Sequence, residues 1–103
     1  MRRAVDRATL ARLRALRSED ALALLAIHLK ADRDYRPIKD LTSRRWHAHT
    51  ERGDFEILTT RHRWYDTRAR KGGGGAIDLV MHGGDLSFVD AVTYLRQRAH
   101  VRG

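Results

Sequence analysis

The chain has 103 residues, of which 42% are hydrophobic and 33% charged, enough for one small folded domain. It contains no cysteine, which excludes a disulfide framework and any zinc site with thiolate ligands, and which is consistent with a cytoplasmic protein. Its 21 Lys and Arg against 13 Asp and Glu give a net charge of +8, which favours an anionic partner.

The excess of positive charge lies before residue 72. Residues 33–71 carry eleven Lys and Arg against six acids, whereas residues 72–103 carry three of each. Arginine makes up 18 of the 21 basic residues, and its planar guanidinium can bind two phosphate oxygens at once. This distribution predicts a nucleic-acid-binding segment, and the alternative is an arginine-rich composition inherited from a GC-rich genome.

Two helices are predicted in residues 1–30. Leucines at helical spacing indicate a first helix over residues 6–17, whose arginine-rich side is a candidate docking or homodimer surface. Ser18 has the position of an N-cap for a second helix over about 19–30. Pro37 ends the helical pattern, because proline cannot continue a helix.

The hydrophobic period changes to two between residues 44 and 66. In residues 45–50, Trp46, Ala48 and Thr50 alternate with the basic or imidazole side chains of Arg45, His47 and His49. The segments FEILTT and HRWYD follow as short strands. Residues 35–71 are therefore predicted to form a basic antiparallel meander of three strands, with a fourth strand near 35–39 as an option.

Four glycines, residues 72–75, separate the basic segment from a third predicted helix. Glycines before a helix allow close approach to the backbone and leave N–H groups for an anion. With Arg68, Arg70 and Lys71 just upstream, the run predicts a phosphate-contacting turn at Gly73, Gly74 and Gly75, and the alternative is a flexible turn. The run is not a Walker A loop, because the lysine precedes the glycines.

Two further helices are predicted in residues 72–99. The segment AIDLVMH forms the first, and the segment GGD is expected to end it. Ser87 and Asp90 have the spacing of a capping box for the second. The fold class is thus α+β: one domain over residues 1–103, with a sheet of three to four strands flanked by N-terminal and C-terminal helices.

Several of these features occur together and in order over residues 55–99: a strand containing Phe55, the pair Trp64–Tyr65, the glycine run and the segment LSFVDAVTYL. This stretch resembles the N-terminal zinc-binding domain of bacterial replicative primases and related plasmid and phage primases. The resemblance implies a zinc-ribbon-like sheet and a role in engaging single-stranded template DNA, while nucleotide transfer belongs to a separate domain.

The resemblance also implies that the metal has been lost. Thr67 and Arg70 stand where the family has a Cys-x-x-Cys knuckle, and Arg45 stands at the first ligand of the other pair. The second ligand position of that pair falls at about Ala48 or His49. We therefore expect a metal-free scaffold and no cofactor, with a residual site formed by three histidines as the alternative: His47, His49 and His62.

These observations predict a non-enzymatic module that binds single-stranded DNA in the replication or priming system of a plasmid, phage or other mobile element. Tyr65 is expected to be exposed for base stacking, and Trp64 is favoured as a core residue. The alternative is an adaptor or regulator that docks on a helicase, polymerase or primase, and the chain is either a complete small protein or part of a longer one. The predicted nucleic-acid-binding residues are Arg45, His47, Arg61, Arg63, Trp64, Tyr65, Arg68, Arg70 and Lys71.

Overall fold

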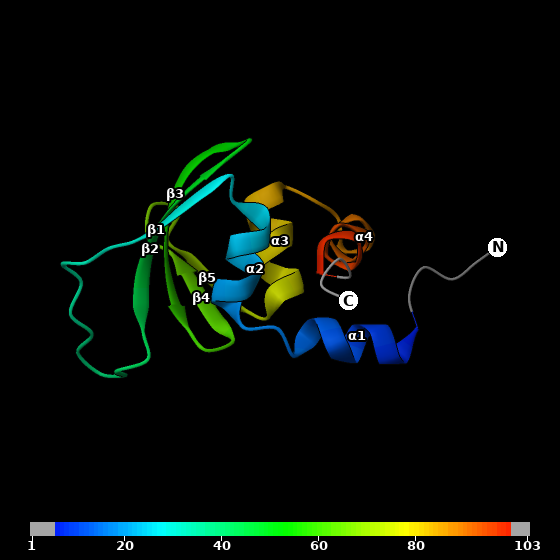
Figure 1. The fold of residues 1–103 in the computed structure, drawn as a ribbon, viewed down its shortest axis with the longest axis horizontal. Coiled ribbons are helices and arrows are strands. Elements are labelled where there is room, and N and C mark those ends of the chain that lie inside the picture. The colour runs from blue at the N-terminus through cyan, green and yellow to red at the C-terminus, as the bar shows by residue number, and fades with distance from the viewer. Residues whose placement is uncertain (1–5, 100–103) are drawn as a thin grey trace.

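The computed structural model describes residues 6–99, which form an α+β fold, as predicted (Figure 1). The sheet has five strands rather than three or four. None of the described helices combines the length and apolar character needed to cross a bilayer. In chain order the elements are α1 (Arg7–Arg14), α2 (Ser18–Leu25), β1 (His28–Ala31), β2 (Arg44–Thr50), β3 (Gly53–Thr60), β4 (Arg63–Asp66), β5 (Lys71–Gly74), α3 (Ala76–Gly84) and α4 (Phe88–Ala99).

The sheet is a simple antiparallel meander in which the spatial order of the strands is their order in the chain. Helices α2 and α3 lie against one face of the sheet, and α4 packs on the side of α3 away from it (Figure 1). No helix within residues 6–99 covers the opposite face, which we call the open face (Figure 1). The loop between β1 and β2 extends beyond one end of the sheet (Figure 1).

The core lies between the sheet and the helices. Ala48, Ile57 and Trp64 from the sheet are at most 3% exposed, and Leu22 and Leu79 from the helices are 1% exposed. The predicted alternation is confirmed over residues 47–50, because the even positions 48 and 50 are buried and the odd positions 47 and 49 are exposed, whereas Arg45 and Trp46 are both half-buried. The core position favoured for Trp64 is also confirmed.

The second helix is shorter than predicted. It ends at Leu25, because Ala26 has an extended backbone with ψ of 143°, and the chain then enters β1, which pairs with β2. The strand considered near residues 35–39 is wrong, since this segment belongs to the loop between β1 and β2. Ser18 is the first residue of α2 and not its N-cap, and its N–H donates to the Arg61 carbonyl at 2.9 Å.

Residues 72–74 of the glycine run belong to the edge strand β5 and not to a turn, which corrects the prediction, and Gly75 then precedes α3 with φ of 90°. Gly73 packs so closely against neighbouring groups that an added Cβ would overlap the Asp78 carboxylate and lie 2.9 Å from Cζ2 of Trp64. On the open face, a Cβ at Gly72 would lie 3.0 Å from Cδ1 of Tyr65. The glycines therefore let two aromatic side chains of β4 pack on opposite faces of β5.

The predicted end of the third helix at the segment GGD is confirmed. Helix α3 continues through Gly84, and Asp85 ends it in a left-handed conformation with φ of 56°. The N-cap role of Ser87 is supported, because its hydroxyl accepts a hydrogen bond from the Asp90 N–H at 3.1 Å.

Candidate nucleic-acid interface

The open face is not uniformly basic. Cross-strand register places Arg45, Leu58 and Tyr65 side by side across the middle of it, and His47 beside Glu56. Acidic groups therefore lie among the predicted cationic residues, and the contacts of each cation decide whether its charge is available to a ligand.

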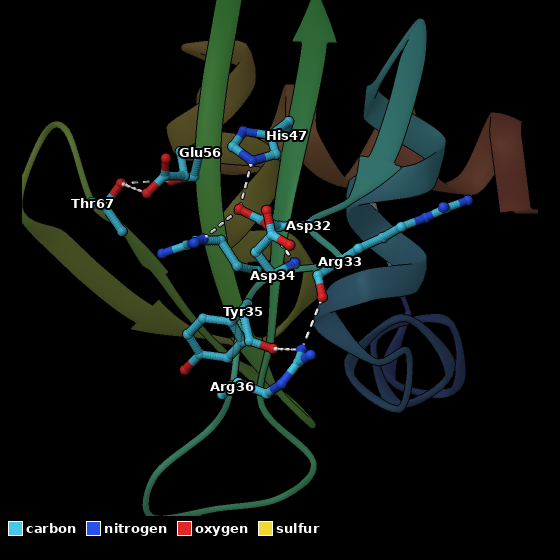
Figure 2. Close-up of polar contacts among 9 residues, drawn as sticks. Asp32, Arg33, Asp34, Tyr35, Arg36, His47, Glu56 and Thr67 are labelled. Carbon is cyan, nitrogen blue, oxygen red and sulfur yellow. Dashed lines mark hydrogen bonds and ion pairs between the residues drawn. The ribbon is translucent and has the colours of Figure 1, made fainter.

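Arg45 and His47 are brought together by a carboxylate from the β1–β2 loop. Nε2 of His47 lies 3.0 Å from an Asp32 carboxylate oxygen (Figure 2). Nε of Arg45 lies 2.8 Å from the same oxygen. The Arg45 guanidinium also lies 5.1 Å from the centre of the Tyr35 ring. Both predicted site residues thus hold the loop against the open face, and the Arg45 charge is compensated inside the protein.

The Asp32 carboxylate is a measurable reporter of this cluster. Hydrogen bonds from His47 and from the Asp34 N–H, together with Arg45, lower its pKa to about 2, against an opposing effect of desolvation. Its stabilising contribution is therefore complete above the unfolded-state pKa of about 3.9 and is lost as the pH falls towards 2.

We expect His47→Ala to raise the pKa of Asp32, because the largest stabilising contact of the carboxylate is removed. Carboxyl-carbon NMR titration measures this pKa directly. Asp40 is the internal control, because hydrogen bonds from Thr42 lower its pKa and His47 takes no part. An unchanged Asp32 pKa in the variant would show that His47 does not bind this carboxylate in solution.

The β4–β5 turn is organised by Asp66, which the sequence analysis did not single out. Its buried carboxylate accepts the Arg68 and Ala69 N–H groups, both at 3.0 Å, and a hydrogen bond from Nε2 of His82 at 2.7 Å. The His82 ring in turn stacks on Trp64 with 4.9 Å between ring centres. This cluster ties the turn to α3. The signal available in the sequence was an acidic residue two positions after a core tryptophan on the same strand face.

Thr67 and Arg70, which the primase resemblance places at cysteine positions, have different environments. The Thr67 hydroxyl donates to a Glu56 carboxylate oxygen at 2.9 Å (Figure 2). Arg70 has a positive φ of 59° and an exposed side chain. The Thr67 side chain therefore attaches the turn to β3, whereas the Arg70 side chain extends into solvent.

The remaining predicted cations gather beside β4 and β5. Arg61 is exposed in the β3–β4 turn and Arg63 is exposed at the start of β4. The β4–β5 turn and the start of β5 present the others, and Tyr65 is 41% exposed on the strand between them. Among the residues that the structure describes, Arg70 and Lys71 have neither a hydrogen-bond partner nor a short ion pair for their side chains. We call this set the β4–β5 surface: Arg61, Arg63, Tyr65, Arg68, Arg70 and Lys71.

The predicted phosphate-contacting turn lacks the free donors that it needs. The Gly74 N–H donates to the Asp78 carboxylate at 3.0 Å, and the Gly75 N–H donates to the His62 carbonyl at 2.5 Å. Gly73 is half-buried beneath Trp64 and Asp78. A carboxylate of the protein therefore occupies the position at the start of α3 that the prediction assigned to an anion.

The three histidines considered as a residual metal site do not converge. His49 lies 2.6 Å from a carboxylate oxygen of Asp54 and stacks on His28 with 6.2 Å between ring centres. His62 lies in the β3–β4 turn with Nε2 3.3 Å from the Ala15 carbonyl. Residues 6–99 hold no group of three or more His, Cys, Asp or Glu side chains arranged for a metal ion.

Comparison with known proteins gives one partial similarity. A stretch of 44 residues, 43% of this chain, is 43% identical to part of the 65 kDa protein of Zymomonas mobilis subsp. mobilis. The matched stretch covers 8% of the length of that protein. No family model matches the chain, and no solved structure matches it.

Proposed function

We propose that the protein is a non-catalytic module that binds single-stranded DNA in the cytoplasm, as an accessory to the replication or priming of a mobile genetic element. The observation that carries the proposal is the β4–β5 surface, where exposed cations lie on both sides of an exposed tyrosine. The replication role rests on the resemblance of residues 55–99 to primase zinc-binding domains.

In the proposed mechanism the arginines and Tyr65 contact different parts of the nucleic acid. Arginines at the start of β4 and in the β4–β5 turn bind phosphates, and displaced counterions drive the association. Tyr65 offers its ring to a base, which requires an unpaired strand because paired bases are already stacked. Trp64 is 3% exposed and contributes by holding β5 in place, not by stacking on a ligand.

The hydrogen bonds of the β4–β5 turn support the proposal of a metal-free scaffold. The contacts of Asp66 with His82 and of Thr67 with Glu56 attach this turn to α3 and to β3. In the related primase domains, by the resemblance, cysteines and a zinc ion occupy this region. A hydrogen-bonded cluster can therefore take over the structural role of the metal.

Fluorescence anisotropy with a labelled oligothymidine tests the binding function. Affinity should fall steeply with salt, and Arg68→Ala/Arg70→Ala should reduce the slope of log affinity against log salt by roughly 1.4, since each phosphate contact on a single strand contributes about 0.7. The matched control is Arg7→Ala/Arg14→Ala on α1, which removes the same amount of charge outside the β4–β5 surface. Absence of binding, or an equal loss of slope in the control, would contradict the proposal.

The second candidate function is an adaptor that docks on a replicative helicase, polymerase or primase. It is favoured by exposed apolar side chains on the helical side of the molecule: Phe88 is 40% and Val89 is 51% exposed on α4. Partners captured from a nuclease-treated lysate, and lost with Val89→Glu, would favour this function. The homodimer through α1 stays a prediction, which analytical ultracentrifugation tests.

A further inference from the structure

The most exposed large hydrophobic side chains among the described residues lie in the loop between β1 and β2. Ile38 is 92% and Leu41 is 84% exposed, whereas the next most exposed such residue, Ile27, is 55% exposed. Two aliphatic side chains presented almost completely to water, three positions apart, make no contribution to the core. Because neither side chain is used by the core, both are free to contact a partner.

The loop that carries them is held by polar contacts on both sides of its tip. The Asp40 carboxylate accepts hydrogen bonds from the Thr42 N–H at 2.9 Å and from the Thr42 hydroxyl at 2.6 Å. The Ser43 hydroxyl lies 2.7 Å from the Thr60 hydroxyl at the end of β3. At the other end of the loop, Asp32 is anchored by Arg45 and His47 (Figure 2). The tip is thus presented by a structured loop.

The tip adjoins the β4–β5 surface. An Asp40 oxygen lies 4.0 Å from Nη1 of Arg61 in the β3–β4 turn, and Arg63 also acts on the Asp40 carboxylate through its charge. Leu41 follows Asp40 directly in the chain and Ile38 lies two positions before it, so the tip lies close to Arg61 and on the side of the molecule where β4 begins. If the phosphates of a nucleic-acid strand bind these arginines, the bases of that strand lie within reach of the tip.

We propose that Ile38 and Leu41 form an apolar wedge that contacts unpaired bases of a single-stranded nucleic acid held by Arg61 and Arg63. The inference rests on the proposed function and extends it by naming a second base-contacting element and a source of strand selectivity. A duplex hides its bases in the stack, and inserting a side chain between them costs a few kcal/mol per step. A single strand offers its bases without that cost.

Charge favours a nucleic acid over a lipid surface as the partner of the tip. Residues 32–43 carry three basic and three acidic side chains, so the loop itself has no net attraction for anionic headgroups. Two aliphatic side chains bury little apolar area, so the tip by itself would attach the protein to a bilayer only weakly. A single-stranded nucleic acid can place its phosphates against the neighbouring arginines and its bases against the tip.

The test compares Ile38→Ser/Leu41→Ser with the unmodified full chain in binding a labelled 20-nucleotide oligothymidine and a duplex of equal length. For the serine variant we expect about tenfold weaker binding of the single strand. Its salt slope, its weak binding of the duplex and the melting temperature of the protein should stay unchanged. Ile38→Phe/Leu41→Phe should restore the affinity, because aromatic rings stack on bases. The matched control, Ile27→Ser/Val89→Ser, removes two exposed apolar groups elsewhere and should bind like the parent.

The outcomes separate this inference from the proposed function. If the unmodified chain binds the oligonucleotide and the serine variant binds it equally well, the wedge is wrong and the β4–β5 surface stands. If the unmodified chain binds no oligonucleotide, both fail. Binding to phosphatidylcholine–phosphatidylserine vesicles that the serine variant loses, without any change in oligonucleotide affinity, would assign the tip to membranes and overturn the inference.

Discussion

Gly73→Ala is expected to lower the free energy of unfolding by about 2 kcal/mol, within the range found when a group is forced into a packed site. The new methyl group would meet the Asp78 carboxylate and lie 2.9 Å from Cζ2 of the buried Trp64. Asp78 can rotate away, but it then leaves the Gly74 N–H that it accepts from. Trp64 cannot move without disturbing its stacking on His82.

Gly74→Ala is the matched control for this prediction. A Cβ at Gly74 would meet only the His62 carbonyl at 3.9 Å, an ordinary contact. Alanine also loses less backbone entropy on folding than glycine, so this variant should be neutral or more stable by up to about 1 kcal/mol. Urea unfolding followed by tryptophan fluorescence measures both variants. Equal stability of the two would mean that β5 does not pack against Trp64 as described.

Asp66→Ala is expected to cost about 3 kcal/mol of stability, because it removes one carboxylate that serves three buried or half-buried donors. The Arg68 and Ala69 N–H groups and His82 would each lose a hydrogen bond. Thermal unfolding at pH 7 gives the measurement. The control is Asp54→Ala, whose carboxylate is 69% exposed and pairs with His49, and we expect a change below about 1 kcal/mol.

The pH dependence of the Asp66 effect follows from its pKa. Burial opposes ionisation, but hydrogen bonds from the Ala69 N–H, from His82 and from the Arg68 N–H outweigh it and lower the pKa of Asp66 below its ordinary value. The folded pKa is the lower one, so the stabilisation is present above about pH 4 and is lost as the pH falls through the folded value. The stability difference between parent and variant should therefore shrink below pH 4, and a constant difference down to pH 2 would contradict the assignment.

The elements that could be predicted are those whose signal is local. The alternation in residues 45–50 predicts which side chains of β2 are buried over residues 47–50, because a half-buried strand has a period of two. The same argument places Trp64 in the core and leaves Tyr65 41% exposed. Leucine spacing predicts α1, although its boundaries differ from the prediction by one to three residues.

The elements that the sequence analysis missed depend on neighbours that are distant in the chain. Residues 28–31 continue a helical pattern, yet they form β1 because β2 offers them a hydrogen-bonding edge. Lys71–Gly74 has no strand propensity, and it becomes β5 because β4 supplies both the backbone partner and an aromatic side chain on each face.

The candidate site likewise has one feature that the sequence predicts and one that only the fold creates. Composition and charge distribution determine that residues 33–71 form a basic segment, and residue order alone cannot distinguish Arg45 from Arg63. Tertiary structure decides between them, because folding brings Asp32 to 2.8 Å from Arg45 and leaves Arg63 exposed beside Tyr65. The physical reason is that a local pattern specifies which side chains share a face, whereas the availability of a charge depends on which carboxylates the chain brings to it through space.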